Sequence, residues 1–175
     1  MGPMTLPPMP TLARAALIGA ATGSRSLTGL AALTLTAPAA AATQPDRTLR
    51  SSWVKALVAS GALGELGADK LPATPDRLGP RGLAGRVLIA ALTGPIVARR
   101  RWPSRPGEAG PPDHDPAVTG AAVTAAAVGV GSALAAAWIG SRWRRVAARH
   151  FGPDWPGAVL EDAAALSLAR AAVRP

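Results

Sequence analysis

The stretch AVTGAAVTAAAVGVGSALAAAWIG, from Ala117 to Gly140, decides the fold prediction, because its 24 residues carry no charge. A helix rises 1.5 Å per residue, so the stretch would be roughly 36 Å long as a helix, and a bilayer hydrocarbon core is about 30 Å thick. Asp113 and Asp115 precede the stretch, and arginines follow it from Arg142 onward. It therefore predicts a transmembrane helix, with an alanine-rich buried helix of a soluble protein as the alternative.

The composition of the whole chain favours the membrane interpretation. Its 175 residues predict one domain, and only 17% of them are charged, against roughly 25% in typical soluble domains. Alanine, leucine, valine and 19 glycines dominate the chain, and small residues suit close helix contacts inside a bilayer. Cysteine is absent from the sequence, which excludes disulfides, thiolate metal sites and a cysteine nucleophile.

Apolar segments on both sides of this stretch predict further helices. Each of them carries at least one charge, and they cover residues 12–37, 53–71, 82–98 and 155–173. Because proline breaks helices, the proline- and glycine-rich regions predict loops at about 38–52, 72–81, 99–116 and 143–154. We expect an all-α fold: a polytopic membrane helical bundle of about five helical segments. It would form a single helical membrane domain over residues 12–174, after a disordered N-terminal arm at residues 1–11.

The N-terminal half leaves two alternatives open. Gly23 and Ser24 beside Arg25 would loosen the first segment, which is then a broken or re-entrant helix. The same region also has the pattern of a signal peptide with cleavage near Ala40–Ala42, so that a mature chain would begin near residue 43. Arginine clusters follow both the third and the fourth segments, so the positive-inside rule gives no membrane orientation.

Tryptophan positions agree with a membrane arrangement. All five tryptophans fall at predicted segment ends, and indole rings prefer the headgroup level of a bilayer. We therefore predict an interfacial tryptophan belt.

Charged residues inside the apolar segments are the candidate functional residues. Glu65 and Asp69 are i,i+4 neighbours on a helix, so both carboxylates face the same way, beside a small-residue face with Gly61 and Gly64. Ionisable groups in a membrane interior are costly and normally paired, which makes them a functional-site hypothesis. Arg25, near the middle of the first segment, is the expected partner of Glu65 or Asp69.

The remaining candidates lie on the second, third and last segments. Lys70 would extend to the headgroups if its helix ends near the membrane edge. Arg86 is a candidate partner for Glu161 or Asp162, which are adjacent and about 100° apart on a helix, so they cannot share one face. Three interpretations stay open for all these charges: structural pairing of helices, handling of a ligand or ion, and solvation at the interface.

A weak internal repeat links two of the acidic positions. Residues 61–65 read GALGE and residues 157–161 read GAVLE, and each follows a glycine-rich apolar segment. Duplicated halves with acids on equivalent helices are common in transporters. Alanine- and glycine-rich sequences also produce such matches by chance, so duplication and coincidence both stay open.

Signatures of soluble enzymes and of nucleic-acid binding are absent from the sequence. It contains no G-x-S-x-G, P-loop or H-E-x-x-H motif, and we expect neither an enzyme nor a metal or organic cofactor. His114 lies between two aspartates in a polar loop and is expected to be solvated. The net charge of +9 comes without an aromatic stacking surface, so we expect the bilayer and its anionic lipid headgroups as partners, and no nucleic acid.

Three short motifs contain most of these candidates. Residues 64–72 read GELGADKLP, residues 19–26 read GAATGSRS, and residues 160–163 read LEDA. They resemble the E-x-x-A-D-K-x-P segment, the glycine-rich first helix with G-x-R, and the closing L-E-D segment of small bacterial membrane proteins catalogued as domain of unknown function 4126. The resemblance covers about residues 12–174, while the loop at 103–116 departs from it. It implies a helical integral membrane protein and supplies no activity.

Two functional hypotheses follow for a multi-pass protein of the bacterial inner membrane. In the first, it is a transport-, channel- or permeation-type component, with Arg25, Glu65 and Asp69 lining or gating a polar path. In the second, it is a structural or interaction protein whose buried charges only pin helix packing, and whose small-residue faces bind a second copy or a membrane partner. A membrane-embedded enzyme would need a nucleophile or metal set that the sequence does not supply.

Overall fold

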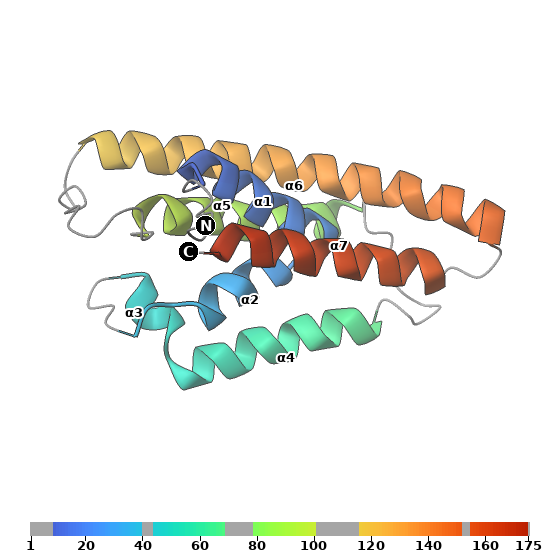
Figure 1. Cartoon of the computed structure of the whole chain (residues 1–175), viewed down its shortest axis with the longest axis horizontal. Coiled ribbons are helices and arrows are strands. Elements are labelled where there is room, and N and C mark those ends of the chain that lie inside the picture. Colours follow the sequence, from blue (N-terminus) through green and yellow to red (C-terminus); the bar gives the residue numbers. More distant parts are fainter. Residues whose placement is uncertain (1–8, 40–43, 69–78, 101–115, 152–154, 175) are drawn as a thin grey trace, which may run out of the picture.

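The computed structural model describes residues 9–39, 44–68, 79–100, 116–151 and 155–174, and these ranges contain helices and no strand (Figure 1). In chain order the helices are α1 (Thr11–Ser24), α2 (Thr28–Leu35), α3 (Asp46–Leu49), α4 (Ser52–Ala68), α5 (Pro80–Arg99), α6 (Pro116–Phe151) and α7 (Trp155–Val173). The all-α class predicted from the sequence is therefore confirmed.

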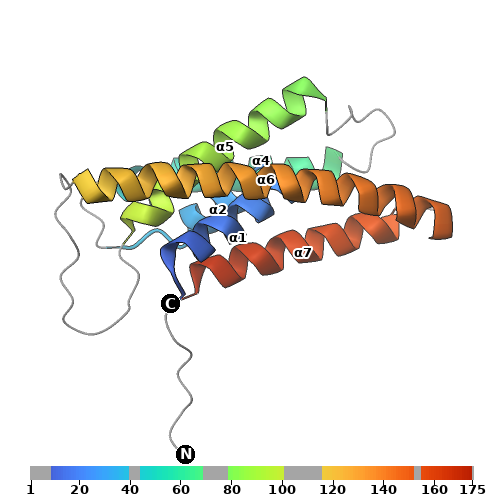
Figure 2. The same cartoon turned by 90° about the horizontal axis from the view of Figure 1, so that it is seen from above.

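Helix α1 lies at the centre of the bundle. It packs against α5, α6 and α7, and the 36-residue α6 runs along the whole length of the molecule (Figures 1 and 2). Helix α2 turns away from the end of α1, and α4 packs against α2 and α3 at the edge of the bundle. The end of α1 therefore lies among several helices that are distant in sequence.

Glycine allows α1 and α5 to approach α6 closely. A Cβ atom at Gly19 or Gly23 would collide with the backbone of α6 at Gly129 or Ala133. A Cβ atom at Gly94 of α5 would likewise lie only 2.6 Å from the backbone of α6. Such backbone-to-backbone contacts are typical of helix pairs inside a bilayer, where packing holds helices together in place of the hydrophobic effect.

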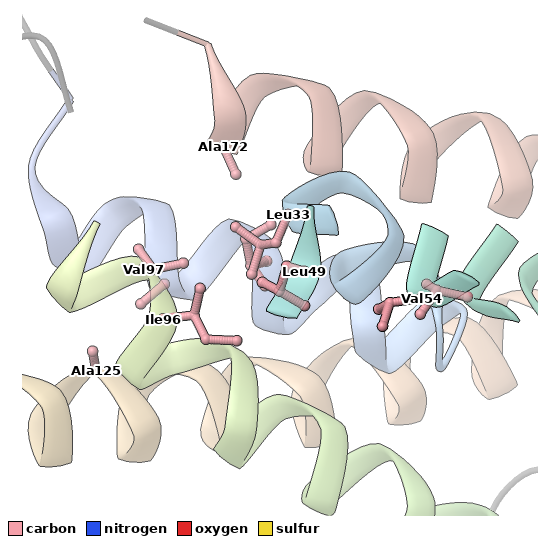
Figure 3. Close-up of a cluster of buried hydrophobic side chains, with 10 residues drawn as sticks. Leu33, Leu49, Val54, Ile96, Val97, Ala125 and Ala172 are labelled. Atoms are coloured by element: carbon pink, nitrogen blue, oxygen red, sulfur yellow. The ribbon is translucent and has the colours of Figure 1, made fainter. Parts of the chain in front are cut away.

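A small apolar core joins the short helices to the long ones. Leu33 of α2 and Leu49 of α3 are buried in one cluster with Ile96 and Val97 of α5, and Ala172 of α7 lies at its edge (Figure 3). This core fixes α2 and α3 against the C-terminal end of α5.

Several polar side chains are buried beside the apolar core, while large apolar side chains are exposed. Arg25 is the largest of the fully buried side chains, and Thr22, Thr34 and Thr93 are also fully buried. Large apolar side chains are exposed on every long helix: Trp53, Leu57, Leu63, Leu88, Leu92, Val123, Leu134, Trp138, Ile139, Val159, Leu160 and Leu166. Water-soluble proteins rarely expose so much apolar surface, whereas a bilayer would solvate it.

Two of the described helices are long and apolar enough to cross a membrane. They are Pro80–Arg99, which is the whole of α5, and the 32-residue Thr119–His150 part of α6, which contains most of the uncharged stretch. The remaining helices are shorter or carry more charges. Length and composition therefore identify fewer spanning helices in the described part of the chain than the five segments predicted.

Several predicted boundaries are wrong. The first segment is two helices, because the backbone is extended at Arg25 between α1 and α2. The loop predicted at 38–52 contains α3 and the first residue of α4, and the loop predicted from residue 143 is helical as far as Phe151. Arginine and alanine are strong helix formers, so the arginines after Gly140 end the apolar pattern without ending the helix. Residues 1–8 of the predicted N-terminal arm lie outside the described residues.

The N-terminal region is an integral part of the bundle. Arg14 of α1 is buried and donates hydrogen bonds to the carbonyl oxygens of Ala172 and Arg174, at 2.7 and 2.6 Å. Carbonyls at a helix C-terminus have no partner within the helix, so this guanidinium caps the end of α7. Cleavage near residue 43 would remove this cap together with α1 and α2.

Candidate functional site

The candidate site is built around the break between α1 and α2. After Ser24 the backbone becomes extended, with φ −140° and ψ 114° at Arg25, and α2 starts at Thr28. Glycine and serine at the end of α1 have low helix propensity, which explains why the helix ends there. The broken helix that the sequence left as an alternative is the observed conformation, and it leaves the Arg25 side chain 2% exposed.

Arg25 forms an ion pair with Asp162 of α7. Its Nε donates a hydrogen bond to Asp162 Oδ1 at 2.5 Å, and its Nη2 contacts the same oxygen. The Asp162 side chain is 16% exposed, so the pair is largely removed from solvent. The expectation that Glu65 is the ion-pair partner of Arg25 is wrong, because α7 lies beside α1 and brings Asp162 to that position. Asp69, the other expected partner, and Lys70 lie outside the described residues.

Glu65 of α4 binds the backbone at the break instead. One carboxylate oxygen accepts a hydrogen bond from the Ser26 N–H at 2.7 Å, and the other accepts one from the Leu27 N–H at 3.1 Å. N–H groups at the start of a helix have no partner within it, and the helix dipole favours negative charge there. Glu65 thus caps the N-terminal end of α2 from another helix.

Glu161, next to Asp162 on α7, faces α6. Its Oε2 accepts a hydrogen bond from Arg144 Nε at 3.0 Å, and both side chains are largely buried. Gly140 makes room for it, because a Cβ atom there would lie 3.0 Å from Glu161 Oε1. The two adjacent acids pair with arginines on different helices, as their angular separation on α7 requires.

Arg86 of α5 belongs to the same electrostatic environment. It is buried and experiences attraction from Glu65 and Glu161 and repulsion from Arg25. Its Nη1 also donates a weak hydrogen bond to the Gly82 carbonyl oxygen at 3.4 Å. The structure thus brings Arg86 close to Glu161, one of its two predicted partners.

Together these groups form what we call the charged cluster, to which four helices and the break between α1 and α2 contribute. Its described members are Arg25, Glu65, Arg86, Arg144, Glu161 and Asp162. Three guanidinium groups thus balance three carboxylates, so the described set carries no net charge, and removing one member would leave an uncompensated buried charge. Of the seven residues predicted from the sequence, the structure brings together five, and Asp69 and Lys70 fall outside the described ranges.

Arg144 is a member that the sequence interpretation missed. It was expected to lie in a loop with the other arginines after Gly140, as part of an exposed basic cluster. Buried positions of α6 such as Ala133, Ala137 and Ala147 recur at helical spacing, and Arg144 falls on that same face. A predicted helix that continued past Gly140 would have placed Arg144 on this buried face.

A second buried arginine fixes the other end of α2. Arg100 donates hydrogen bonds to Asp46 Oδ1, to the Leu33 carbonyl oxygen at 2.9 Å and to Thr36 Oγ1 at 3.1 Å. The Leu33 carbonyl belongs to the last turn of α2, where the helix dipole favours positive charge. The short helix α2 is therefore held between an acid at its start and an arginine at its end.

The charged cluster is a set of paired polar groups around the break between α1 and α2. The described residues contain no group of three or more His, Asp or Glu side chains that could hold a metal ion. Thr22, one turn before the break, has a buried hydroxyl oxygen without a hydrogen-bond partner among the described residues. Near the break the Arg25 guanidinium donates to Asp162, and the Ser26 and Leu27 N–H groups donate to Glu65.

No protein family, curated protein or solved structure matches this chain in the comparisons that we made.

Proposed function

We propose that this chain is a multi-pass membrane protein of the bacterial inner membrane, and that the charged cluster serves the permeation of a small polar or charged solute. The observation that carries the proposal is the buried break between α1 and α2. Discontinuous helices whose half-helix ends meet buried charges are typical of solute sites in transporters. Irregular backbone in a membrane protein is tolerated where it is buried in protein, as it is at Arg25.

The exposed apolar side chains support the membrane part of the proposal. Beside its apolar core the interior holds arginines and threonines, while leucines and tryptophans of four helices are exposed. A bilayer would remove the free-energy cost of exposing that apolar surface to water. Charged groups inside a membrane protein are costly, so they are normally paired or take part in a function.

Membership of the family of domain of unknown function 4126 belongs to the same proposal. The three motifs that carry the resemblance contain Arg25, Glu65 and the Glu161–Asp162 pair. These motifs are far apart in the sequence, yet Arg25, Glu65 and Asp162, one from each motif, lie together at the break. Convergence of motif residues on one site is the pattern expected when they share a function.

A second candidate function is purely structural. Each described carboxylate of the charged cluster already has a donor: Arg25 for Asp162, Arg144 for Glu161, and two N–H groups for Glu65. A satisfied network of this kind can specify which helices pack together without handling any solute. In that case the protein would be a scaffold or interaction partner in the membrane, and not an enzyme.

Flux measurements separate the two candidates. The purified full chain would be reconstituted into vesicles of phosphatidylcholine and phosphatidylglycerol that contain pyranine to report protons or lucigenin to report chloride. The permeation proposal expects flux above that of protein-free vesicles, and expects Glu65→Gln to lower it toward that background while the helical circular dichroism spectrum is unchanged. Arg170→Gln, at an exposed position of α7 outside the charged cluster, is the control and should keep the flux. A folded wild-type protein without flux for either probe would favour the structural function.

A further inference from the structure

The C-terminal part of α6 carries three arginines that the charged cluster does not use. Arg142, Arg145 and Arg149 are exposed, and their spacing of three and four residues places them on one face of the helix. We call these three residues the arginine stripe. Arg144 lies on the opposite, buried face, where it pairs with Glu161.

Trp138 continues the arginine stripe toward the apolar part of α6. It precedes Arg142 by four residues, is 54% exposed, and has the Arg142 guanidinium over its ring at 4.9 Å from the centroid. Trp143 and Val146 are also partly exposed in this part of the helix. The outer face of α6 therefore changes from apolar to tryptophan and then to arginine within three turns.

This order of residues corresponds to the layers of a bilayer surface. From Thr119 to Trp138 a helix rises roughly 28 Å, close to the hydrocarbon thickness of about 30 Å. With Trp138 at the edge of the hydrocarbon, Arg142 and Arg145 would lie roughly 6 and 10 Å beyond it, at headgroup level. The overhang of α6 at this end is visible in Figure 2, where the helix extends past its neighbours.

In the described part of α6 and α7, no acidic side chain pairs with the arginine stripe. The acids of these two helices are Glu161 and Asp162, and both are engaged in the ion pairs with Arg144 and Arg25. The stripe is thus a positive surface whose counter-charge must come from outside these helices. Basic residues at a membrane surface attract anionic lipids, at about 1 kcal/mol for each arginine or lysine.

We propose that the arginine stripe, with Trp138 beside it, is a docking surface for anionic phospholipid headgroups. Each arginine would supply a forked pair of N–H donors to a phosphate, and the tryptophan would fix the depth of the helix in the bilayer. This inference rests on the membrane residence proposed above, and it is independent of solute permeation. It assigns a specific lipid-binding role to residues that lie outside the charged cluster.

Lipid competition in a bilayer tests the proposal. The full chain would be reconstituted into vesicles of dioleoylphosphatidylcholine with increasing dioleoylphosphatidylglycerol. The preference among lipids that contact the protein would be measured by quenching of tryptophan fluorescence with brominated forms of each lipid. We expect preferential quenching by phosphatidylglycerol in the wild-type protein. An attraction of about 1 kcal/mol per arginine corresponds to about fivefold in lipid affinity. We therefore expect the preference to fall by about a hundredfold in the triple variant with Arg142→Gln, Arg145→Gln and Arg149→Gln.

Two further variants separate the stripe from general charge effects. Arg47→Gln, Arg99→Gln and Arg170→Gln combined remove the same charge from exposed positions on three different helices and should change the preference much less. Lysine at the three stripe positions keeps the charge and should keep most of the preference. An equal loss in both glutamine triples, or no preference in the wild-type protein, would overturn the proposal.

Vesicle flotation distinguishes failure of this inference from failure of membrane residence. If all variants float with vesicles and phosphatidylglycerol is still not preferred, only the docking surface is refuted. If the wild-type protein does not float, the membrane proposal itself is refuted. Stripe-dependent binding of an RNA oligonucleotide with unchanged lipid preference would assign the stripe to nucleic acid and overturn the lipid proposal.

Discussion

The ion pair between Arg25 and Asp162 makes a quantitative prediction about stability. Replacing Arg25 with methionine keeps most of the side-chain volume and leaves Asp162 without its main counter-charge. Removing one member of a buried ion pair typically costs about 3–5 kcal/mol. The Asp162 side chain is 16% exposed, so water can relieve part of the cost, and we expect Arg25→Met to lose about 3 kcal/mol.

The reverse substitution should cost more. Asp162→Asn leaves the Arg25 guanidinium, which is 2% exposed and stays charged, so we expect a loss of about 5 kcal/mol. The double variant contains no orphaned charge from this pair. It should therefore be at least about 2 kcal/mol more stable than the sum of the single losses would give.

The assay is reversible unfolding of the purified chain in mixed detergent micelles with increasing dodecyl sulfate, followed by far-ultraviolet circular dichroism. Arg170→Met is the matched control, because Arg170 is an exposed arginine of α7 outside the charged cluster, and it should change stability by no more than about 0.5 kcal/mol. Strict additivity of Arg25→Met and Asp162→Asn would refute the pairing. A loss for Arg25→Met as small as that of the control would refute the burial of the charge.

Three further predictions concern packing, the second buried arginine and membrane residence. Gly23→Ala should destabilise the protein by about 1–3 kcal/mol because its Cβ would collide with α6 at Ala133, while Gly131→Ala, in open space, should be neutral or slightly stabilising in the same unfolding assay. Arg100→Met should cost about 3–5 kcal/mol because it orphans Asp46 and the end of α2, and combination with Asp46→Asn should recover part of the loss. The full-length chain should remain with membranes during carbonate extraction, and release of intact soluble protein would contradict its proposed residence in the bilayer.

The sequence predicted the helical class and most of the helix positions because apolar periodicity and proline placement are local signals. It also placed a possible break at Gly23 and Ser24, where helix propensity is low. The partners of the charged side chains were less predictable. A helical wheel tells which residues of one helix share a face, but it does not tell which helix that face will meet.

The partner of Arg25 illustrates this limit. Asp162 is 137 residues away in the sequence, and only the packing of α7 against α1 brings the two together. Arg144 and Arg100 were missed for a different reason. Both lie next to other arginines after an apolar segment, and such clusters normally face solvent or headgroups. In the structure Arg100 and Arg144 are turned inward, and each pairs with an acid.

The absence of cysteine from the sequence allows the membrane claim to be tested at single residues. Ala127 and Ala148 are both exposed on α6, the first within the uncharged stretch and the second beyond the tryptophans. Each would be replaced by cysteine in the full chain, and alkylation by N-ethylmaleimide would be measured in intact membranes and again after addition of dodecyl sulfate.

A thiol in hydrocarbon reacts poorly, because alkylation requires the thiolate and burial in apolar surroundings disfavours it. If α6 spans the bilayer, Ala148→Cys will be alkylated in intact membranes, while Ala127→Cys will react only after dodecyl sulfate is added. Equal alkylation of both thiols in intact membranes would contradict a membrane-spanning α6.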